Sequence, residues 1–213
     1  MEKKIHTVIF DLDGTLCDSA VLTMAAFESI VPAHGLKMPS EASIRRTTGY
    51  PNPEFYHILF PDSPKDLITG MGQMVEQEEL RITQQVSGRL IFPGCRDLLA
   101  ILKQRGISMK IASTGDERHV YSVINETGIG DFFETVSCGQ SDKTEMLKKL
   151  TEKGDRSCYL MVGDMKKDYE AARKNNIRSV GACYGYCRRD LSDFDHYIDT
   201  PLELLDILKL YGG

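Results

Sequence analysis

The sequence lacks the features that would place it in a membrane, outside the cell or on a nucleic acid. No apolar run approaches the ~20 residues that a membrane-spanning helix requires, and no charged-then-apolar signal peptide opens the chain. The 26 lysines and arginines are fewer than the 31 aspartates and glutamates, and the net charge of −5 argues against a nucleic-acid polymer as partner. We therefore expect a soluble, cytoplasmic protein, either a monomer or a homodimer.

Cysteine pairs at metal-ligand spacing are also missing. The six cysteines are scattered and form no Cys-x-x-Cys pair: Cys17, Cys95, Cys138, Cys158, Cys183 and Cys187. Cys183 and Cys187 have no second pair of ligands at a suitable spacing, which argues against a zinc site. The pattern is typical of reduced, mostly buried thiols.

What the sequence does contain is an alternation of apolar runs and helical segments. Of its 213 residues 41% are hydrophobic, enough for a packed core. Strands are predicted at 5–10, 107–113, 134–138, 157–162, 179–182 and 196–198. Helices are predicted at 18–34, 95–105, 117–127, 142–152, 166–175 and 201–210. This alternation predicts an α/β fold, a Rossmann-like doubly wound parallel sheet covered on both faces.

One long segment interrupts the alternation. Residues 39–88 contain five prolines and no convincing strand, and 64–86 is their longest helix candidate. The simplest organisation is an α/β core of residues 1–15 and 90–213 with an all-α insertion of residues 16–89. The two crossings, near 15–18 and 88–94, are candidate hinges. Asp18 or Ser19 is expected to cap the first inserted helix, and Gly35 to end it.

Acidic side chains follow two of the predicted strands. Asp11 and Asp13 stand in an Asp-x-Asp-Gly turn after Val8-Ile9-Phe10, and Asp164 follows Tyr159–Val162, with Asp168 four residues on. Carboxyl ends of parallel strands are where open α/β sheets bind ligands. One carboxylate can attack phosphorus and another can move protons, while Asp11 and Asp164 offer Mg²⁺ hard oxygen ligands. The alternatives are solvated turn acids and acids at a helix N-terminus.

Two further segments supply groups for an anion. Ser113 and Thr114 close the strand at 107–113, where a hydroxyl and loop amides can hold phosphate oxygens. Lys143 follows the next strand and can neutralise a phosphate, and Asp168 can orient this lysine or a metal-bound water. The alternatives are a helix N-cap for Ser113 and Thr114, and a plain surface charge for Lys143. Together these strand ends would converge on one edge of the sheet.

With these motifs in this order, the chain resembles the haloacid dehalogenase-like hydrolase superfamily over essentially its whole length. Asp11-Leu12-Asp13-Gly14-Thr15-Leu16 matches the first motif, Ser113 the second and Lys143 the third. Gly163-Asp164 with Asp168 matches the fourth. The insertion at 16–89 is similar to the helical cap domain of the family. The subgroup it most resembles is that of phosphoglycolate phosphatase and β-phosphoglucomutase.

The resemblance implies a role for each matched residue. Asp11 would be the nucleophile and a Mg²⁺ ligand, and Asp13 the general acid and base, binding the metal through its backbone carbonyl. Ser113 and Lys143 would hold the phosphoryl group. Asp164 would complete the metal site with support from Asp168.

The reaction that the resemblance implies is hydrolysis of a small phosphorylated metabolite, phosphoglycolate-like or a sugar phosphate, through an aspartyl-phosphate. Thr15 stands where phosphatases of the family carry threonine and the mutase type carries valine, and Asp13 argues against the metal-free dehalogenases. A phosphomutase, a pyrophosphatase or a nucleotidase on the same scaffold is the alternative. A non-catalytic phosphate-binding module is the alternative from another class.

The inserted segment is expected to set specificity, because it contributes the groups on the leaving-group side. Arg45, Arg46, Gly49 and Tyr50 form the candidate loop, in which an arginine would bind a second anionic group of the substrate. The alternative is a solvated, charged helix end.

Overall fold

The computed structural model describes residues 3–48, 50, 52–186 and 193–212. Six parallel strands form one sheet in the order β3-β2-β1-β4-β5-β6. They are β1 (Thr7–Phe10), β2 (Ser108–Ala112), β3 (Thr135–Ser137), β4 (Tyr159–Gly163), β5 (Arg178–Ala182) and β6 (His196–Ile198). The first strand, β1, lies in the interior of the sheet between β2 and β4, and the later strands extend the sheet in both directions. The doubly wound parallel sheet that the sequence predicts is therefore confirmed.

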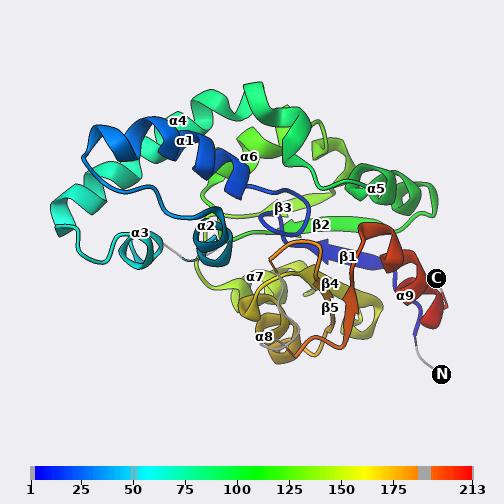
Figure 1. The fold of residues 1–213 in the computed structure, drawn as a ribbon. Coiled ribbons are helices and arrows are strands. Elements are labelled where there is room, and N and C mark those ends of the chain that lie inside the picture. The colour runs from blue at the N-terminus through cyan, green and yellow to red at the C-terminus, as the bar shows by residue number, and fades with distance from the viewer. Residues whose placement is uncertain (1–2, 49, 51, 187–192, 213) are drawn as a thin grey trace.

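Helices cover both faces of this sheet (Figure 1). They are α5 (Cys95–Gln104), α6 (Glu117–Glu126), α7 (Lys143–Leu150), α8 (Lys166–Lys174) and α9 (Leu204–Leu210). Successive side chains of a strand point to opposite faces. On β1, Val8 and Phe10 therefore join the core under α5, α6 and α9, whereas Ile9 packs with α7 and α8. Burial on both faces explains why β1 and β4 read as unbroken apolar runs.

The inserted segment contains the helices α1 (Ala20–Ala33), α2 (Glu41–Thr47), α3 (Glu54–Leu59) and α4 (Lys65–Leu90). Helix α1 packs against α4, and α4 packs against α6 of the sheet domain. Apolar side chains of α1 and α4, such as Phe27 and Met71, belong to the same core as Phe10. These helices therefore pack on α6, on the side where the strands have their carboxyl ends (Figure 1).

Most predicted elements are confirmed within a few residues, and Gly35, in the left-handed region at φ 68°, follows α1 as expected. The last predicted helix differs, because Pro201–Glu203 forms a 3₁₀ turn before α9 begins. Ser19 is the N-cap residue of α1, but its side chain makes no capping hydrogen bond. It contacts Asp13 instead.

The thiols are less deeply buried than expected. Among the cysteines that the structure describes, Cys17 and Cys95 are buried, whereas Cys138, Cys158 and Cys183 are partly exposed. Cys187 lies outside the described residues. In the part of the chain that the structure covers, none of the helices combines the length and the apolar character needed to cross a bilayer.

Candidate active site

The first carboxylate is held where β1 ends. Asp11 is 3% exposed, its backbone N–H donates to the Val162 carbonyl of β4 at 2.9 Å, and its Oδ1 accepts from the Leu12 N–H at 2.9 Å. The bond to β4 continues the sheet pairing by one residue. The Asp11 side chain is therefore positioned by the centre of the sheet.

Asp164 approaches Asp11 from the end of β4. Its Oδ1 accepts from the Thr15 hydroxyl at 3.3 Å, while its Oδ2 is buried with no hydrogen-bond partner. The turn of the first motif passes so close that a Cβ on Gly14 would lie 2.3 Å from Asp164 Oδ2. Gly14 also has φ 81°, so two independent constraints require glycine there. A buried acceptor without a partner is costly, which makes Asp164 Oδ2 a natural ligand for a cation.

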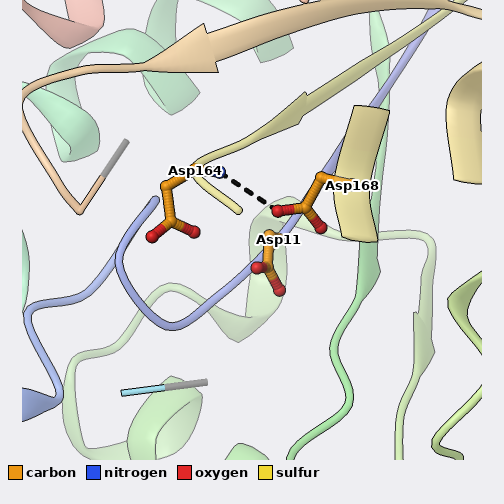
Figure 2. Close-up of side chains that lie close together, drawn as sticks. All are labelled: Asp11, Asp164 and Asp168. Atoms are coloured by element: carbon orange, nitrogen blue, oxygen red, sulfur yellow. Dashed lines mark hydrogen bonds between the residues drawn. The ribbon is translucent and has the colours of Figure 1, made fainter. Parts of the chain in front are cut away.

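Asp168 completes a buried cluster with Asp11 and Asp164 (Figure 2). Oxygens of the three carboxylates lie within 4.8 Å of one another. Asp168 caps α8 by accepting from the N–H groups of Asp164 at 3.1 Å and Met165 at 2.8 Å. It is thus both a helix-capping residue and part of the acidic cluster, so the two sequence interpretations coexist.

Lys143, the first residue of α7, is buried among these acids. Its Nζ lies 2.8 Å from Asp11 Oδ1 and also donates to Asp168 Oδ1. Burial alone would lower the pKa of Lys143, but Asp11 and Asp168 raise it above its usual value. The interpretation as a surface charge is therefore wrong, because the side chain is only 2% exposed.

Three carboxylates around one ammonium leave the cluster with unbalanced negative charge. Burial and the charge of Asp168 raise the pKa of Asp11 to about 6, although Lys143 opposes this shift. Burial and the charges of Asp11 and Asp168 raise the pKa of Asp164 well above its usual value. A divalent cation would relieve both effects, and a few carboxylate oxygens are the ligands that Mg²⁺ prefers. The donor set and the unpartnered oxygen of Asp164 both fit such an ion.

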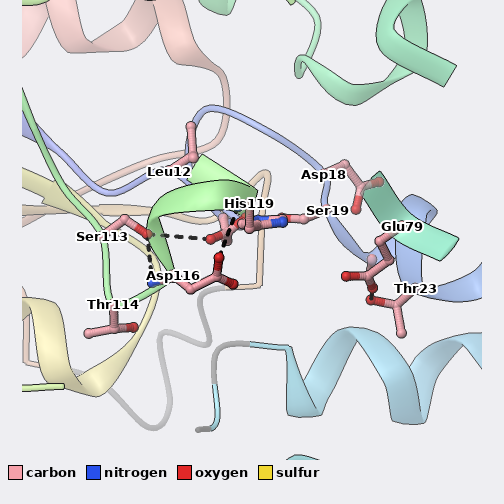
Figure 3. Close-up of polar contacts among 12 residues, drawn as sticks. Leu12, Asp18, Ser19, Thr23, Glu79, Ser113, Thr114, Asp116 and His119 are labelled. Carbon is pink, nitrogen blue, oxygen red and sulfur yellow. Dashed lines mark hydrogen bonds and ion pairs between the residues drawn. The ribbon is translucent and has the colours of Figure 1, made fainter. Parts of the chain in front are cut away.

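Asp13 is not part of this cluster and has partners of its own, His119, Ser19 and Ser113, which are labelled in Figure 3. Its Oδ1 accepts from His119 Nε2 at 2.8 Å and from the Ser19 hydroxyl, and its Oδ2 lies 3.5 Å from the Ser113 hydroxyl. Burial alone would raise the pKa of Asp13, but the His119 charge and the hydrogen bonds from His119 and Ser19 lower it to about 2. Burial opposes protonation of His119, yet Asp13 raises its pKa to about 9. The two groups form an ion pair at neutral pH.

His119 was not among the residues predicted from the sequence. It stands in the first turn of α6, after the N-cap Asp116, whose side chain accepts from the His119 N–H at 3.1 Å. The signal was its position six residues after Ser113, because the first turn of a helix that follows a strand faces the same sheet edge. A lone histidine in a polar stretch carried no motif to single it out.

We expect the His119→Asn variant to lose stability below neutral pH. The pKa of His119 is raised from 6.5 to about 9 on folding, so its stabilisation is fully present below about 6.5 and disappears as the pH rises through 9. Losing a charged hydrogen bond lowers the free energy of unfolding by about 1.5–3 kcal/mol. For a chain of this length, each kcal/mol lowers Tm by roughly 2–4 °C. Thermal unfolding between pH 6 and 9.5 measures the difference.

The control for this variant is His6→Asn, because His6 is exposed and precedes β1, whereas Asp13 follows it. The Tm gap between wild type and His119→Asn should shrink toward pH 9.5, and His6→Asn should show no such gap. Parallel Tm curves for wild type and His119→Asn over the whole range would contradict the ion pair.

The Ser113–Thr114 loop lies at the end of β2 beside Asp13. Ser113 is 1% exposed and its hydroxyl accepts from the Gly115 N–H at 3.0 Å, while the Thr114 hydroxyl accepts from Lys167 Nζ. The N-cap alternative for these two residues is wrong, because Asp116 caps α6.

A cavity of about 450 Å³ opens onto these groups. From the sheet domain it is lined by Asp11, Asp13, Thr114, Gly115, Asp116, His119, Gly139, Gln140, Ser141, Met165 and Lys167. From the inserted helices it is lined by Ser19, Thr23, Thr48, Tyr50, Asn52, Phe55, Tyr56 and Glu79. Its size suits a small ligand rather than a polymer.

The predicted specificity loop is only partly at this cavity. Tyr50 lines it, whereas Arg45 forms ion pairs with Asp18 and Glu41. Arg46 points to Ser43, at 3.5 Å, and neither arginine is among the lining residues. The expectation that these arginines face the substrate is not met, because acids of the inserted segment already neutralise Arg45. Gly49 lies outside the described residues.

Sequence comparison places the chain among known proteins. A model of the haloacid dehalogenase-like hydrolase family matches residues 8–182. A phosphoglycolate phosphatase of Vibrio vulnificus is 28% identical over 228 residues, covering 97% of both chains. A phosphoglycolate phosphatase of Synechococcus elongatus is 26% identical over 216 residues, covering 94% of this chain and 96% of the relative.

Solved structures agree in fold. A haloacid dehalogenase-like family hydrolase from Streptococcus pneumoniae superposes with a TM-score of 0.82 at 23% identity, covering 95% of this chain and 98% of that one. A structure described as a predicted phosphoglycolate phosphatase from Haemophilus somnus gives a TM-score of 0.82 at 22% identity, covering 95% and 97%. At these identities the likeness concerns the fold.

Proposed function

The chain belongs to the haloacid dehalogenase-like hydrolase family, and we propose that it is a Mg²⁺-dependent phosphatase of small phosphorylated metabolites. One observation carries the proposal: Asp11, Asp164 and Lys143 meet at the carboxyl ends of β1 and β4, beside a cavity that Asp11 and Asp13 line. The relatives named above as phosphoglycolate phosphatases support the same reaction class.

We propose that Asp11 is the nucleophile. One of its carboxylate oxygens bonds to phosphorus while the bond from phosphorus to the alcohol oxygen breaks, which leaves an aspartyl-phosphate. The alcohol oxygen takes a proton from the Asp13–His119 pair. This proton is initially on His119 Nε2 and reaches the alcohol oxygen through the Asp13 carboxylate. Water then attacks the aspartyl-phosphate, returns a proton to the pair, and regenerates Asp11 with release of phosphate.

The remaining predicted residues would hold the phosphoryl group and the metal. Asp11, Asp164 and the Asp13 backbone carbonyl would hold Mg²⁺, which when bound offsets the phosphate charge. Lys143 would neutralise the transferred group beside Asp11, and Ser113 and Thr114 would face it from β2. Asp168 would act through Lys143, whose ammonium it fixes by an ion pair.

We propose that residues 16–89 form a cap domain on an α/β core of residues 1–15 and 90–213. The arrangement of the cavity supports this division, because the inserted helices line the side opposite the strand ends. Groups on this side would meet the alcohol part of the substrate. Contact between cap and core would also limit the access of water to the aspartyl-phosphate.

The test is phosphate release by the purified protein with Mg²⁺. We expect turnover of p-nitrophenyl phosphate and of at least one small phosphomonoester, measured as inorganic phosphate. Pyrophosphate, a nucleoside monophosphate and a hexose 1-phosphate belong in the same panel, to separate a pyrophosphatase, a nucleotidase and a mutase. Transfer of phosphate between hexose positions without release would favour the mutase, and stable phosphorylation without turnover would favour the binding module.

A further inference from the structure

The inserted segment presents polar and aromatic side chains to the cavity. In addition to Ser19, seven residues of this segment line the cavity, and we name this set the helical wall: Thr23, Thr48, Tyr50, Asn52, Phe55, Tyr56 and Glu79. Among the residues that the structure describes, the helical wall contains hydroxyls, an amide, aromatic rings and one carboxylate, but no lysine or arginine. The alcohol part of a substrate would therefore meet hydrogen-bonding groups and a negative charge.

Glu79 is the charged member of the helical wall. It lies on α4, partly buried, and its Oε1 accepts from the Thr23 hydroxyl of α1 at 2.7 Å (Figure 3). Burial raises the pKa of Glu79, the His119 charge and the Thr23 hydrogen bond oppose this shift, and the charges of Asp13 and Asp116 add to it. Four acids, Asp11, Asp13, Glu79 and Asp116, line the cavity with two basic residues, His119 and Lys167, among the residues that the structure describes. A second anionic group near Glu79 is therefore disfavoured, and a hydrogen-bond donor or a cation is favoured.

Among the described residues that line the cavity or lie beside Asp11, the cations belong to the segments that follow β2, β3 and β4, and His119 is the one that acts on Glu79. Lys143 pairs with Asp11 and Asp168, His119 pairs with Asp13, and Lys167 donates to Thr114. Their positions suit the transferred phosphoryl group, which would lie at the strand ends beside Asp11. A second anionic group on the substrate would instead point toward Glu79, where like charges are strongly unfavourable.

From this asymmetry we infer that the enzyme selects phosphomonoesters whose alcohol part carries hydroxyl or ammonium donors and no second anionic group, with Glu79 as the specificity-determining residue. The inference rests on the proposed phosphatase function. It separates this chain from the relatives named for phosphoglycolate, because the carboxylate of that substrate would face Glu79 without a cation among the described lining residues of the helical wall.

The experiment compares kcat/KM for four substrates with Mg²⁺ present: p-nitrophenyl phosphate, glycerol 1-phosphate, ethanolamine phosphate and 2-phosphoglycolate. We expect wild type to favour glycerol 1-phosphate or ethanolamine phosphate over 2-phosphoglycolate by about tenfold or more, since one unfavourable charge contact of modest size corresponds to a factor of ten. Glycerol 1-phosphate and ethanolamine phosphate distinguish hydroxyl from ammonium donors, and preference for either over 2-phosphoglycolate supports the inference.

The Glu79→Gln variant tests the residue itself. It keeps the shape and removes the charge, so the preference against 2-phosphoglycolate should fall about tenfold. The matched control is Glu78→Gln, one residue earlier on α4, where Glu78 pairs with Arg81 and is not among the lining residues. This control should leave the preference unchanged.

Two outcomes overturn the inference alone. They are hydrolysis of p-nitrophenyl phosphate together with a wild-type preference for 2-phosphoglycolate, and an unchanged preference in Glu79→Gln. Absence of phosphate release from all four compounds overturns the proposed function, and the inference with it. The wild-type ratio decides the inference even if Glu79→Gln does not fold.

Discussion

The Asp11→Asn variant should lose phosphate release by about 10⁴-fold or more, because an amide does not replace a carboxylate as the attacking group. The same variant should be more stable than wild type when no metal is present. Phosphate release with Mg²⁺ measures the first effect, and thermal unfolding in EDTA at pH 5 and pH 7.5 measures the second.

The gain in stability follows from the charge of the buried cluster. Folding raises the pKa of Asp11 from 3.8 to about 6, so its favourable contribution is fully present below 3.8 and is lost as the pH rises through 6. Asparagine at this position does not ionise, so the variant does not lose this stability as the pH rises. Lys143 still has Asp168 as an ion-pair partner in the variant. The Tm of Asp11→Asn should therefore exceed that of wild type at pH 7.5, and the gap should narrow at pH 5.

A matched control is Asp62→Asn, which changes an exposed aspartate of the inserted segment. It should alter neither phosphate release nor the pH dependence of Tm. Full activity in Asp11→Asn would overturn its assignment as nucleophile. A lower Tm for Asp11→Asn at pH 7.5 would mean that the ion pair with Lys143 outweighs the repulsion from Asp164 and Asp168.

The sheet and the convergence of the acidic strand ends could be predicted because both depend on local patterns. Strands such as Tyr159–Gly163 are covered on both faces of the sheet, so they appear in the sequence as apolar runs. The residue that follows such a run therefore lies at the carboxyl edge of the sheet. Parallel pairing of β1 with β4 then brings Asp11 and Asp164 together without any further information.

The contacts of single side chains across the cavity could not be predicted in the same way. His119 of α6 meets Asp13, in the turn after β1, across 106 residues. Glu79 meets Thr23 across 56 residues, through the packing of α4 on α1. Such contacts depend on how one helix packs against another. The periodicity of a single sequence does not predict that packing. Arg45 illustrates the same difficulty. Its positive charge predicts that it binds an anionic group of the substrate, but in the structure it forms an ion pair with Asp18.

The proposed Mg²⁺ site leads to the second large predicted effect. Removing Mg²⁺ with EDTA should abolish phosphate release, and adding it back should restore release. In wild type, Mg²⁺ should also raise the free energy of unfolding, by about 2.7 kcal/mol at a hundred times its Kd. This gain is a readout that does not require turnover, and differential scanning calorimetry against Mg²⁺ concentration measures it.

The Asp164→Asn variant separates the metal from the fold. Its buried Oδ2 has no partner in the protein, so the variant removes a ligand without breaking a hydrogen bond to that oxygen. Metal-free Asp164→Asn should be at least as stable as wild type, because folding raises the pKa of Asp164 and its charge is unfavourable. Mg²⁺ should then neither stabilise the variant nor support its turnover, whereas Asp62→Asn should respond like wild type. A full rise in Tm with Mg²⁺ in Asp164→Asn would place the ion elsewhere.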